Sequence, residues 1–426
     1  MKLLIAIPAL NEEASIESII LRSLAARAEI IAGSPVTAVD ITVVSDGSTD
    51  RTVELARRYT DQIQLIVFEK NRGYGAAIKE AWRQSDADLL GFLDADGTCD
   101  PQFFAPLCAT LVCAGADVIL GGRLNAASKM PAIRRVGNVL FATVLTVFSA
   151  QRVRDTASGM RVIRRRSLPK LLPLPDGLHF TPAMSARAIL NDDLKICEIP
   201  MPYHERAGES KLRVGKDGLR FLKVILEATF LYRPSRPLAL AGLIGIAGAG
   251  ALMLLPTLYY LQNHAVLEWM IYRFVVSNML GVVGFLLLCS SYLTERIVRI
   301  TVSNRPRQTL RQGRVAAFFA WRGFWLVPLA LMGAGITLVV PSLVQLARSG
   351  ATYEHWSRFI AMSFLFEIAF MLIITRVIDY TMHLIAGQLA YLQAQPEPAS
   401  AALDPAPQPP APTPSPAGWQ PTHHHS

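Results

Sequence analysis

The sequence has few charged residues and few cysteines for its length. Only 18% of the 426 residues are Asp, Glu, Lys or Arg, whereas 51% are hydrophobic. This composition excludes disorder over the whole length and argues against an ordinary soluble enzyme throughout. The five cysteines are odd in number, form no CxxC pair and lack the spacing of metal ligands, so we expect reduced and mostly buried thiols.

A secretory signal peptide is also missing from the first residues. The apolar stretch at the start is short, contains Pro8 and runs directly into Asn11, Glu12 and Glu13. We therefore expect a buried strand there and an N-terminal part that stays in the cytoplasm. The net charge of +9 is compatible with binding to nucleic acid, to an anionic membrane surface or to a phosphorylated substrate. The positions of the arginines in the sequence are needed to choose among these three partners.

Before residue 234, hydrophobic runs alternate with helical patterns. The expected strands are residues 3–7, 41–44, 63–68, 89–93 and 118–120, and the expected helices are residues 14–28, 51–59, 75–82 and 102–111. This alternation predicts βαβ units, and therefore an α/β domain with a mostly parallel sheet covered by helices on both faces. Ligands of such sheets bind beyond the carboxyl ends of the strands.

Beyond residue 237, four apolar runs reach the length of about 20 residues that a membrane-spanning helix needs. They cover residues 238–261, 272–293, 324–346 and 359–378. The loop between the second and third runs is rich in arginine, whereas the other two connections are short and poor in basic residues. The positive-inside rule therefore predicts an integral, multi-pass membrane protein with its N-terminal domain and both termini in the cytoplasm.

A basic amphipathic stretch precedes the first of these runs. Residues 218–232 place apolar side chains among basic ones, which fits a helix on the membrane surface or a surface helix of the α/β domain; the span that follows favours the first. We expect an α/β domain over residues 1–214, an interfacial helix over 215–236, four membrane helices over 237–390 and a disordered Pro- and Ala-rich tail over 391–426.

Two aspartates, Asp94 and Asp96, end the fourth expected strand with one residue between them. In an extended end or a tight turn, such residues point to the same side. Both carboxylates can then face one divalent cation and the diphosphate that it neutralises, and hard oxygen ligands suit Mg²⁺ or Mn²⁺. Taken alone, the pattern is also consistent with a solvated turn.

Polar residues follow the first two strands as well. Glu12 comes after the first strand and Asp46 after the second, accompanied by Asn11, Ser48 and Asp50. Turns and helix caps explain part of this set, and Asp50 fits a cap, yet one capping residue per helix suffices. Asp46 and Glu12 would be placed to accept hydrogen bonds from a base and a ribose.

The stretch NRGYGAA at residues 71–77 resembles a dinucleotide-binding turn. It fails as one because Ile78 stands in place of the third glycine and because the turn follows the third strand rather than the first. A close backbone approach at a helix N-terminus remains a reasonable expectation for this glycine-bearing turn, which contains Gly73.

Basic residues recur beside polar ones in residues 121–123, 134–138, 155–161 and 206–211. Each cluster alone is also consistent with a solvated surface charge. Four such clusters in a domain that ends at a membrane suggest an anionic ligand, because the guanidinium group of arginine can donate two parallel hydrogen bonds to phosphate oxygens.

Together these segments resemble a known family. IPALNEE, SDGSTD, DAD, MPAIRRVGN, DTASGMR and EIPMPYHERAGESKL are similar, in order and spacing, to family 2 glycosyltransferases of the GT-A fold. The nearest resemblance is to the polyprenyl-phosphate group of dolichyl-phosphate mannose synthases and undecaprenyl-phosphate glucosyltransferases, over roughly residues 1–232. It implies a Rossmann-like GT-A catalytic domain and a metal-dependent, inverting hexosyltransferase that moves a sugar from a GDP-mannose or UDP-glucose type donor to undecaprenyl or dolichyl phosphate.

The resemblance also implies roles for particular residues. The nucleotide-sugar would contact Pro8, Leu10, Glu12, Asp46, Gly73 and Asp94. Mg²⁺ or Mn²⁺ would be held by Asp94 and Asp96, and the lipid phosphate by Arg123, Arg135, Arg206, Ser210 and Lys211. Catalysis would involve Asp96, Asp155 and Arg206, with Asp155 as a base or an orienting group. The sequence departs from the family at Ser45, the first position of its DDGS motif, and at Thr98, where dolichyl-phosphate mannose synthases often have an amide metal ligand.

A lipid monophosphate is already ionised at neutral pH, so in-line attack on the anomeric carbon would need no strong general base. Two alternatives stay open. A processive polysaccharide synthase typically carries QxxRW, but only Trp321-Arg322, in reversed order, is present. A non-catalytic glycolipid transporter would use charges such as Glu367 and Arg376 near the last span. The bilayer is an expected partner, nucleic acid is not, and a homo-oligomer is possible.

Overall fold

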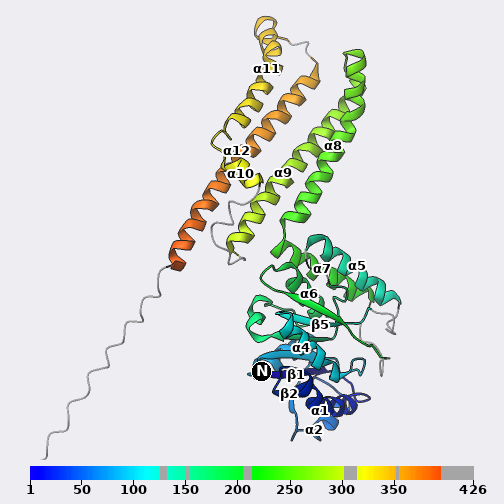
Figure 1. Ribbon diagram of the computed structural model, residues 1–426. Helices are drawn as coiled ribbons and strands as arrows, with labels where there is room; N and C mark the ends of the chain where they lie inside the picture. Colours follow the sequence, from blue (N-terminus) through cyan, green and yellow to red (C-terminus); the bar gives the residue numbers. More distant parts are fainter. Residues whose placement is uncertain are drawn as a thin grey trace, which may run out of the picture.

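The computed structural model describes residues 1–124, 132–149, 151, 153–204, 214–301, 314–351 and 355–394. An α/β domain comes first, and a bundle of long helices follows it (Figure 1). Helix α7 (Val214–Tyr232) stands between the two parts. Most of the expected tail, residues 395–426, lies outside the described residues.

Seven strands form one mixed sheet in the α/β domain. Its order is β3-β2-β1-β4-β6-β5-β7. The strand β6 runs antiparallel to its neighbours β4 and β5, and the other pairs are parallel. The strands are β1 (Lys2–Ala9), β2 (Ala38–Asp46), β3 (Gln64–Phe68), β4 (Leu89–Leu93), β5 (Val118–Gly122), β6 (Met160–Arg164) and β7 (Ile196–Pro200). The five expected strands are confirmed, and β6 and β7 are additional.

Helices pack on both faces of the sheet. They are α1 (Ile16–Gly33), α2 (Thr52–Arg57), α3 (Tyr74–Gln84), α4 (Phe104–Cys113), α5 (Ala132–Phe148) and α6 (Phe180–Leu190), with 3₁₀ turns η1 (Pro101–Phe103) and η2 (Arg165–Lys170). Alternate residues of β4 point into two separate cores, as the two-residue period of a strand requires. Leu90 and Phe92 join the cluster that contains Trp82, whereas Leu89 and Leu93 join the cluster on the opposite face.

Helix α7 has apolar residues on two faces. Phe221 and Ile225 are buried, which fits the interpretation as a surface helix of the α/β domain. Leu219, Leu226 and Phe230 are exposed on the other side, where apolar side chains are available to a membrane surface, as the interfacial interpretation requires. One helix therefore carries the features of both interpretations.

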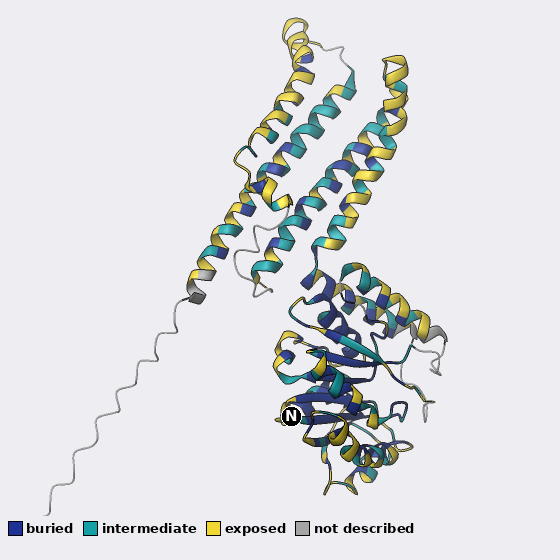
Figure 2. Ribbon diagram, viewed as in Figure 1, coloured by how far each residue is buried: buried dark blue, intermediate teal, exposed yellow. Residues whose placement is uncertain are grey.

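Four helices of the bundle are long and apolar enough to cross a membrane. They are α8 (Ser235–Asn263), α9 (Ile271–Thr301), preceded by η3 (Glu268–Met270), α11 (Leu326–Ser349) and α12 (Trp356–Ala394). Each overlaps one of the expected apolar runs. A short helix, α10 (Arg314–Ala320), precedes α11. Exposed residues line much of these helices (Figure 2), and many are large and apolar, as surfaces in contact with lipid would be.

Glycines allow α8 and α9 to pack closely. A Cβ at Gly242 would lie 2.7 Å from the carbonyl oxygen of Gly284, and a Cβ at Gly284 would lie 2.8 Å from that of Gly242. Ser277 Oγ donates to the Ala249 carbonyl oxygen at 2.9 Å across the same interface. Small residues and an interhelical hydrogen bond are typical of helix pairs in membranes.

Candidate functional site

The loops after β1, β2 and β4 meet at one edge of the sheet. Because β1 pairs in parallel with both β2 and β4, the carboxyl ends of the three strands are adjacent. Pro8 is buried in β1, and Leu10 and Glu12 follow it with partial exposure. The Glu12 N–H donates to Thr52 Oγ1 at 2.8 Å and so ties the first loop to the second.

Asp46, at the end of β2, binds backbone groups of the neighbouring loop. Its carboxylate accepts hydrogen bonds from the N–H of Arg72 at 2.6 Å and of Gly73 at 2.9 Å, and the residue is 3% exposed. Gly73 has φ of +109°, and a Cβ there would overlap the carbonyl oxygen of Asp176. Only glycine fits this conformation and this approach, which fix the start of α3 at the carboxyl edge.

Asp94 is held from two sides. Tyr74 Oη donates to Asp94 Oδ1 at 2.6 Å, and a Cβ at Gly159 would overlap the same carboxylate. Burial, with the charge of Asp94 as the second cause, raises the pKa of Tyr74 well above its usual value, so the phenol keeps the proton that it donates. Tyr74 was missed in the sequence analysis, although it stands within NRGYGAA, because the pattern does not fix where its hydroxyl points.

Asp96 lies in a tight turn and is only 7% exposed. Its Oδ1 accepts hydrogen bonds from the Thr98 N–H at 3.1 Å and from Thr98 Oγ1 at 2.7 Å. Gly97, with φ of +72°, permits the turn. Thr98, one of the two departures from the family, therefore supports an aspartate in this protein. Ser45, the other departure, lies near the end of β2 and donates through Oγ to Ser48 Oγ at 3.0 Å.

The two carboxylates fit a divalent cation that a substrate diphosphate also binds. Asp94 and Asp96 present hard carboxylate oxygens directly after β4. Within the described residues, no group of three or more His, Cys, Asp or Glu could hold an ion on its own. This small donor set matches Mg²⁺, which proteins commonly bind through one or two carboxylates together with substrate phosphates.

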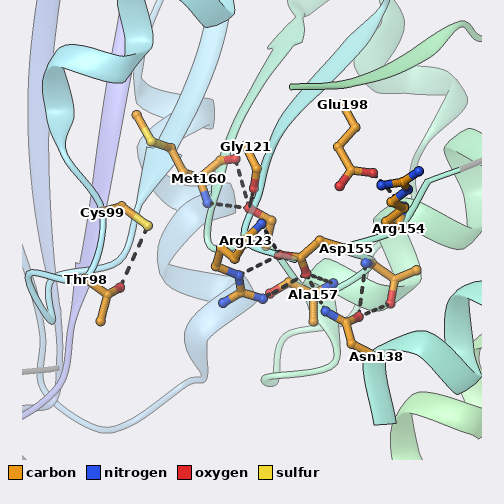
Figure 3. A network of polar contacts seen from close by, with 12 residues as sticks. Thr98, Cys99, Gly121, Arg123, Asn138, Arg154, Asp155, Ala157, Met160 and Glu198 are labelled. Atoms are coloured by element: carbon orange, nitrogen blue, oxygen red, sulfur yellow. Dashed lines mark hydrogen bonds and ion pairs between the residues drawn. The ribbon is translucent and has the colours of Figure 1, made fainter. Parts of the chain in front are cut away.

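A second polar cluster joins Arg123, directly after β5, to Asp155, before β6 (Figure 3). Arg123 Nε lies 2.7 Å from Asp155 Oδ2 and its Nη2 lies 2.9 Å from Oδ1, so the guanidinium forms a two-pronged ion pair. The Arg123 N–H also donates to Asp155 Oδ2 at 3.0 Å. Asn138, on α5, donates through Nδ2 to Asp155 Oδ1 at 2.6 Å.

The Asp155 carboxylate is fully buried and surrounded by donors. Burial by itself would raise its pKa, but the charge and hydrogen bonds of Arg123 and the amide of Asn138 outweigh burial and lower the pKa below its usual value. Conversely, burial would lower the pKa of Arg123, and Asp155 raises it instead. A carboxylate with lowered pKa and this many donors is a weak proton acceptor.

Arg161, on β6, was quoted in the DTASGMR segment without a role of its own. Its side chain is completely buried. Nε donates to the Ser158 carbonyl oxygen at 3.0 Å, and Nη2 to that of Thr156 at 2.8 Å. Nη1 donates to Ser185 Oγ at 2.9 Å. Burial lowers its pKa to about 10, so the group remains charged at neutral pH and fixes the loop that carries Gly159 against Asp94.

The remaining residues of the expected phosphate site are placed only in part. Arg135 is exposed on α5. Arg206, Ser210 and Lys211 lie outside the described residues. The chain that leads to them passes the two aspartates, because the His204 N–H donates to the Thr98 carbonyl oxygen at 2.9 Å.

Tyr203, next to His204, faces the same groups. The guanidinium carbon of Arg123 lies 5.4 Å from the centre of the Tyr203 ring. Burial raises the pKa of Tyr203, and Asp96 and Asp94 add to the increase while Arg123 opposes it. Tyr203 therefore lies over the guanidinium of Arg123, on the segment that the His204 N–H joins to Thr98.

The site can be set beside known proteins. The model of the family described as glycosyl transferase family 2 matches residues 4–172. A dolichyl-phosphate hexose transferase of Haloferax volcanii is 35% identical over 176 residues, which cover 40% of this chain and 72% of that protein. An undecaprenyl-phosphate 4-deoxy-4-formamido-L-arabinose transferase of Pseudomonas aeruginosa is 30% identical over 246 residues, which cover 57% of this chain and 68% of that protein.

Among solved structures, glucosyl-3-phosphoglycerate synthase from Mycobacterium tuberculosis, in complex with Mn²⁺, uridine diphosphate and glucosyl-3-phosphoglycerate, is 20% identical. The match covers 53% of this chain and 79% of that chain, with a TM-score of 0.42. The sheet described above and four long apolar helices give the GT-A-like architecture that the resemblance implied. This chain is therefore a glycosyltransferase, and it belongs to glycosyl transferase family 2, where its relatives include polyprenyl-phosphate sugar transferases.

Proposed function

We propose that this protein transfers one sugar from a nucleotide-sugar to a polyprenyl phosphate, with a divalent cation and with inversion at the anomeric carbon. One observation carries the proposal: Asp94 lies against the loop of residues 155–159, which Arg123 also binds, in a domain that α7 joins to four long apolar helices. A water-soluble donor and a lipid acceptor have to meet where such a domain borders the bilayer. The acceptors named for the two relatives, dolichyl and undecaprenyl phosphates, support the same class of acceptor here.

The nucleotide-sugar would bind at the carboxyl ends of β1 and β2. Pro8, Leu10 and Glu12 border this edge. We assign Asp46 an indirect part, because its carboxylate holds the backbone of residues 72–73, including Gly73. The donor phosphates would then extend toward the turn that follows β4, where ligands of open α/β sheets bind.

Asp94 and Asp96 would hold Mg²⁺ or Mn²⁺. When bound, such a cation neutralises charge that develops on the departing nucleoside diphosphate. Tyr74 and Gly159 restrict the position of the Asp94 carboxylate, and Thr98 restricts that of Asp96. Geometry fixed before the substrates arrive is what electrostatic stabilisation of a transition state requires.

The acceptor phosphate oxygen would attack the anomeric carbon as the bond from that carbon to the diphosphate breaks. Because a phosphate monoester is ionised at neutral pH, no proton has to be removed by a strong base. We therefore assign Asp155 the orienting role rather than that of a base, through its ion pair with Arg123. Arg135, Arg206, Ser210 and Lys211 would contact the lipid phosphate.

The catalytic domain and both termini would lie on the cytoplasmic side. Sequence residues 302–313, between α9 and α10, contain Arg305, Arg307 and Arg311, and arginines in short loops favour the cytoplasmic side. The exposed apolar face of α7 would rest in the interface beside the first span.

The test uses purified full-length protein with polyprenyl phosphate and a panel that includes GDP-mannose and UDP-glucose, and mass spectrometry of the lipid products. We expect one added hexose from one donor. Asp94→Asn should abolish the product, whereas Asp86→Asn, the same change at a side chain that is 81% exposed and bound to Lys2, should not. Long polymers would identify a processive synthase, and no product from any donor would refute the proposal.

A further inference from the structure

A cavity of about 530 Å³ lies in the helical bundle, at the end nearest the α/β domain. Its wall includes Ser235, the first residue of α8, which directly follows α7 and Pro234. Ala239 of α8 also lines it, and helices α9, α10 and α12 supply the rest. The volume is in the range of ordinary ligand-binding pockets.

Aromatic packing builds one wall of this cavity. The rings of Tyr292, on α9, and Phe319, on α10, are stacked, with their centres 4.8 Å apart. Phe319, Phe324 and Leu372 form a buried cluster that attaches α10 to α12. The short helix α10 therefore supplies one wall of the cavity, beside α9 and α12.

Guanidinium groups are concentrated in the same lining. It contains Arg296, Arg299 and Arg314, but only one carboxylate, that of Glu295. Arg299 Nε lies 3.1 Å from Glu295 Oε1. The other carboxylate oxygen of Glu295 accepts a hydrogen bond from Ser235 Oγ at 2.6 Å. The lining therefore has more positive than negative groups beside an apolar wall.

Arg296 is the most buried of the three arginines. Its side chain is 8% exposed, and its Nε lies 2.9 Å from Asp379 Oδ1 on α12. Arg376 Nη1 lies 3.5 Å from the other oxygen of Asp379, so four guanidinium groups share two carboxylates at this end of the bundle. An anionic headgroup complements such an excess of guanidinium groups, which bind phosphate oxygens well.

We propose that this cavity binds a lipid with a phosphate headgroup, the phosphate at the arginines and the first part of the hydrocarbon chain against the aromatic wall. Two sources share this chemistry, a polyprenyl phosphate and an anionic phospholipid. The proposal rests on the proposed function only for the first source, where the cavity would hold acceptor lipid close to the catalytic domain. For the second source it is a site for membrane lipid, independent of the reaction.

Binding is measured on purified full-length protein in detergent by native mass spectrometry, which counts bound molecules and so separates this cavity from the catalytic site. The probes are farnesyl phosphate, farnesol and dioleoyl phosphatidylglycerol. We expect farnesyl phosphate to bind at least about tenfold more tightly than farnesol, a difference of about 1.4 kcal/mol. Competition by the phospholipid would identify it as the source, and binding without such competition would identify polyprenyl phosphate.

Two variants test the site by different means. The double variant Arg299→Gln/Arg314→Gln should weaken binding of farnesyl phosphate by about tenfold for each lost guanidinium. Ala316→Trp fills the cavity without a change of charge and should remove the same bound molecule. The matched control is Arg273→Gln/Arg348→Gln, at the other end of the bundle, which should bind as wild type.

The proposal is overturned if farnesol binds as well as farnesyl phosphate, or if both site variants bind like the control. Its failure is distinguishable from failure of the proposed function. Asp94→Asn should lose sugar transfer and keep the bound lipid. Wild-type protein that transfers no sugar but binds farnesyl phosphate through these arginines would refute the function and leave the cavity site standing.

Discussion

The hydrogen bond from Tyr74 to Asp94 gives the sharpest test of the carboxylate site. Tyr74→Phe removes only the hydroxyl that donates to Asp94 Oδ1 at 2.6 Å. A hydrogen bond to a charged group contributes about 1.5–3 kcal/mol, and 1.4 kcal/mol corresponds to a factor of ten. Without the hydroxyl, the carboxylate loses its fixed orientation, and we expect the transfer rate to fall by about tenfold to a hundredfold.

The assay is the initial rate of lipid-linked sugar formation as a function of Mg²⁺ or Mn²⁺ concentration. The matched control is Tyr59→Phe, which also removes a hydroxyl that donates to a carboxylate, that of Glu17 at 2.8 Å, on the surface of α1. Tyr59→Phe should keep the wild-type rate. Because the pKa of Tyr74 is raised, its ionisation should not reduce the wild-type rate up to about pH 10, the usual phenol value.

A Tyr74→Phe enzyme with the rate and metal dependence of wild type would refute this reasoning. It would mean that Gly159 and the turn alone hold Asp94, or that Asp94 has no part in the reaction. Equal losses in Tyr74→Phe and Tyr59→Phe would point to a general loss of stability instead. Thermal unfolding of the three proteins separates that outcome from a local effect.

Four further predictions follow from the same cluster. Gly159→Ala places a methyl group on the Asp94 carboxylate, and the rate at saturating donor should fall by about a hundredfold. Asp155→Asn leaves Arg123 buried without its charge partner, which should cost about 3–5 kcal/mol, measured by urea unfolding. Because the pKa of Asp155 is lowered in the folded state, its contribution to stability should be complete above about pH 4 and lost as the pH falls through that lowered value, measured as unfolding temperature against pH. Removal of divalent cations with a chelator should stop transfer, and added Mg²⁺ or Mn²⁺ should restore it in the same rate assay.

The elements with a strong local signal could be predicted from the sequence. Alternating apolar runs gave the five strands β1 to β5, and long apolar runs gave the four helices of the bundle, because both patterns depend on neighbouring residues. The strand β6 could not be predicted, since its place between β4 and β5 is set by pairing with residues far away in the chain. This insertion brings the loop of residues 155–159 beside Asp94.

The candidate site also has a part that the sequence could predict and a part that it could not. The position of Asp94 and Asp96 at a strand end follows from their spacing. The partners Tyr74 and Thr98 do not, because the direction of a side chain depends on packing between distant segments. Arg123 and Asp155 were expected to act on different groups, yet the structure joins them in one buried ion pair, which no sequence pattern specifies.

Charge balance connects this ion pair with the proposed cation site. Three aspartates, Asp94, Asp96 and Asp155, share this site with the partly buried Arg123 and the buried Arg161, so these five groups sum to a charge of −1 when all are ionised. One divalent cation would change that sum to +1 and favour a diphosphate. Arg161 is charged at neutral pH because its pKa is about 10. Without it, the net charge of the cluster would be −2 before the cation binds and zero afterwards. No positive charge would then remain to attract the diphosphate of the donor. Among the described residues, Arg161 donates to two backbone oxygens and one hydroxyl but to no carboxylate, and a buried arginine of this kind makes electrostatic sense in this position.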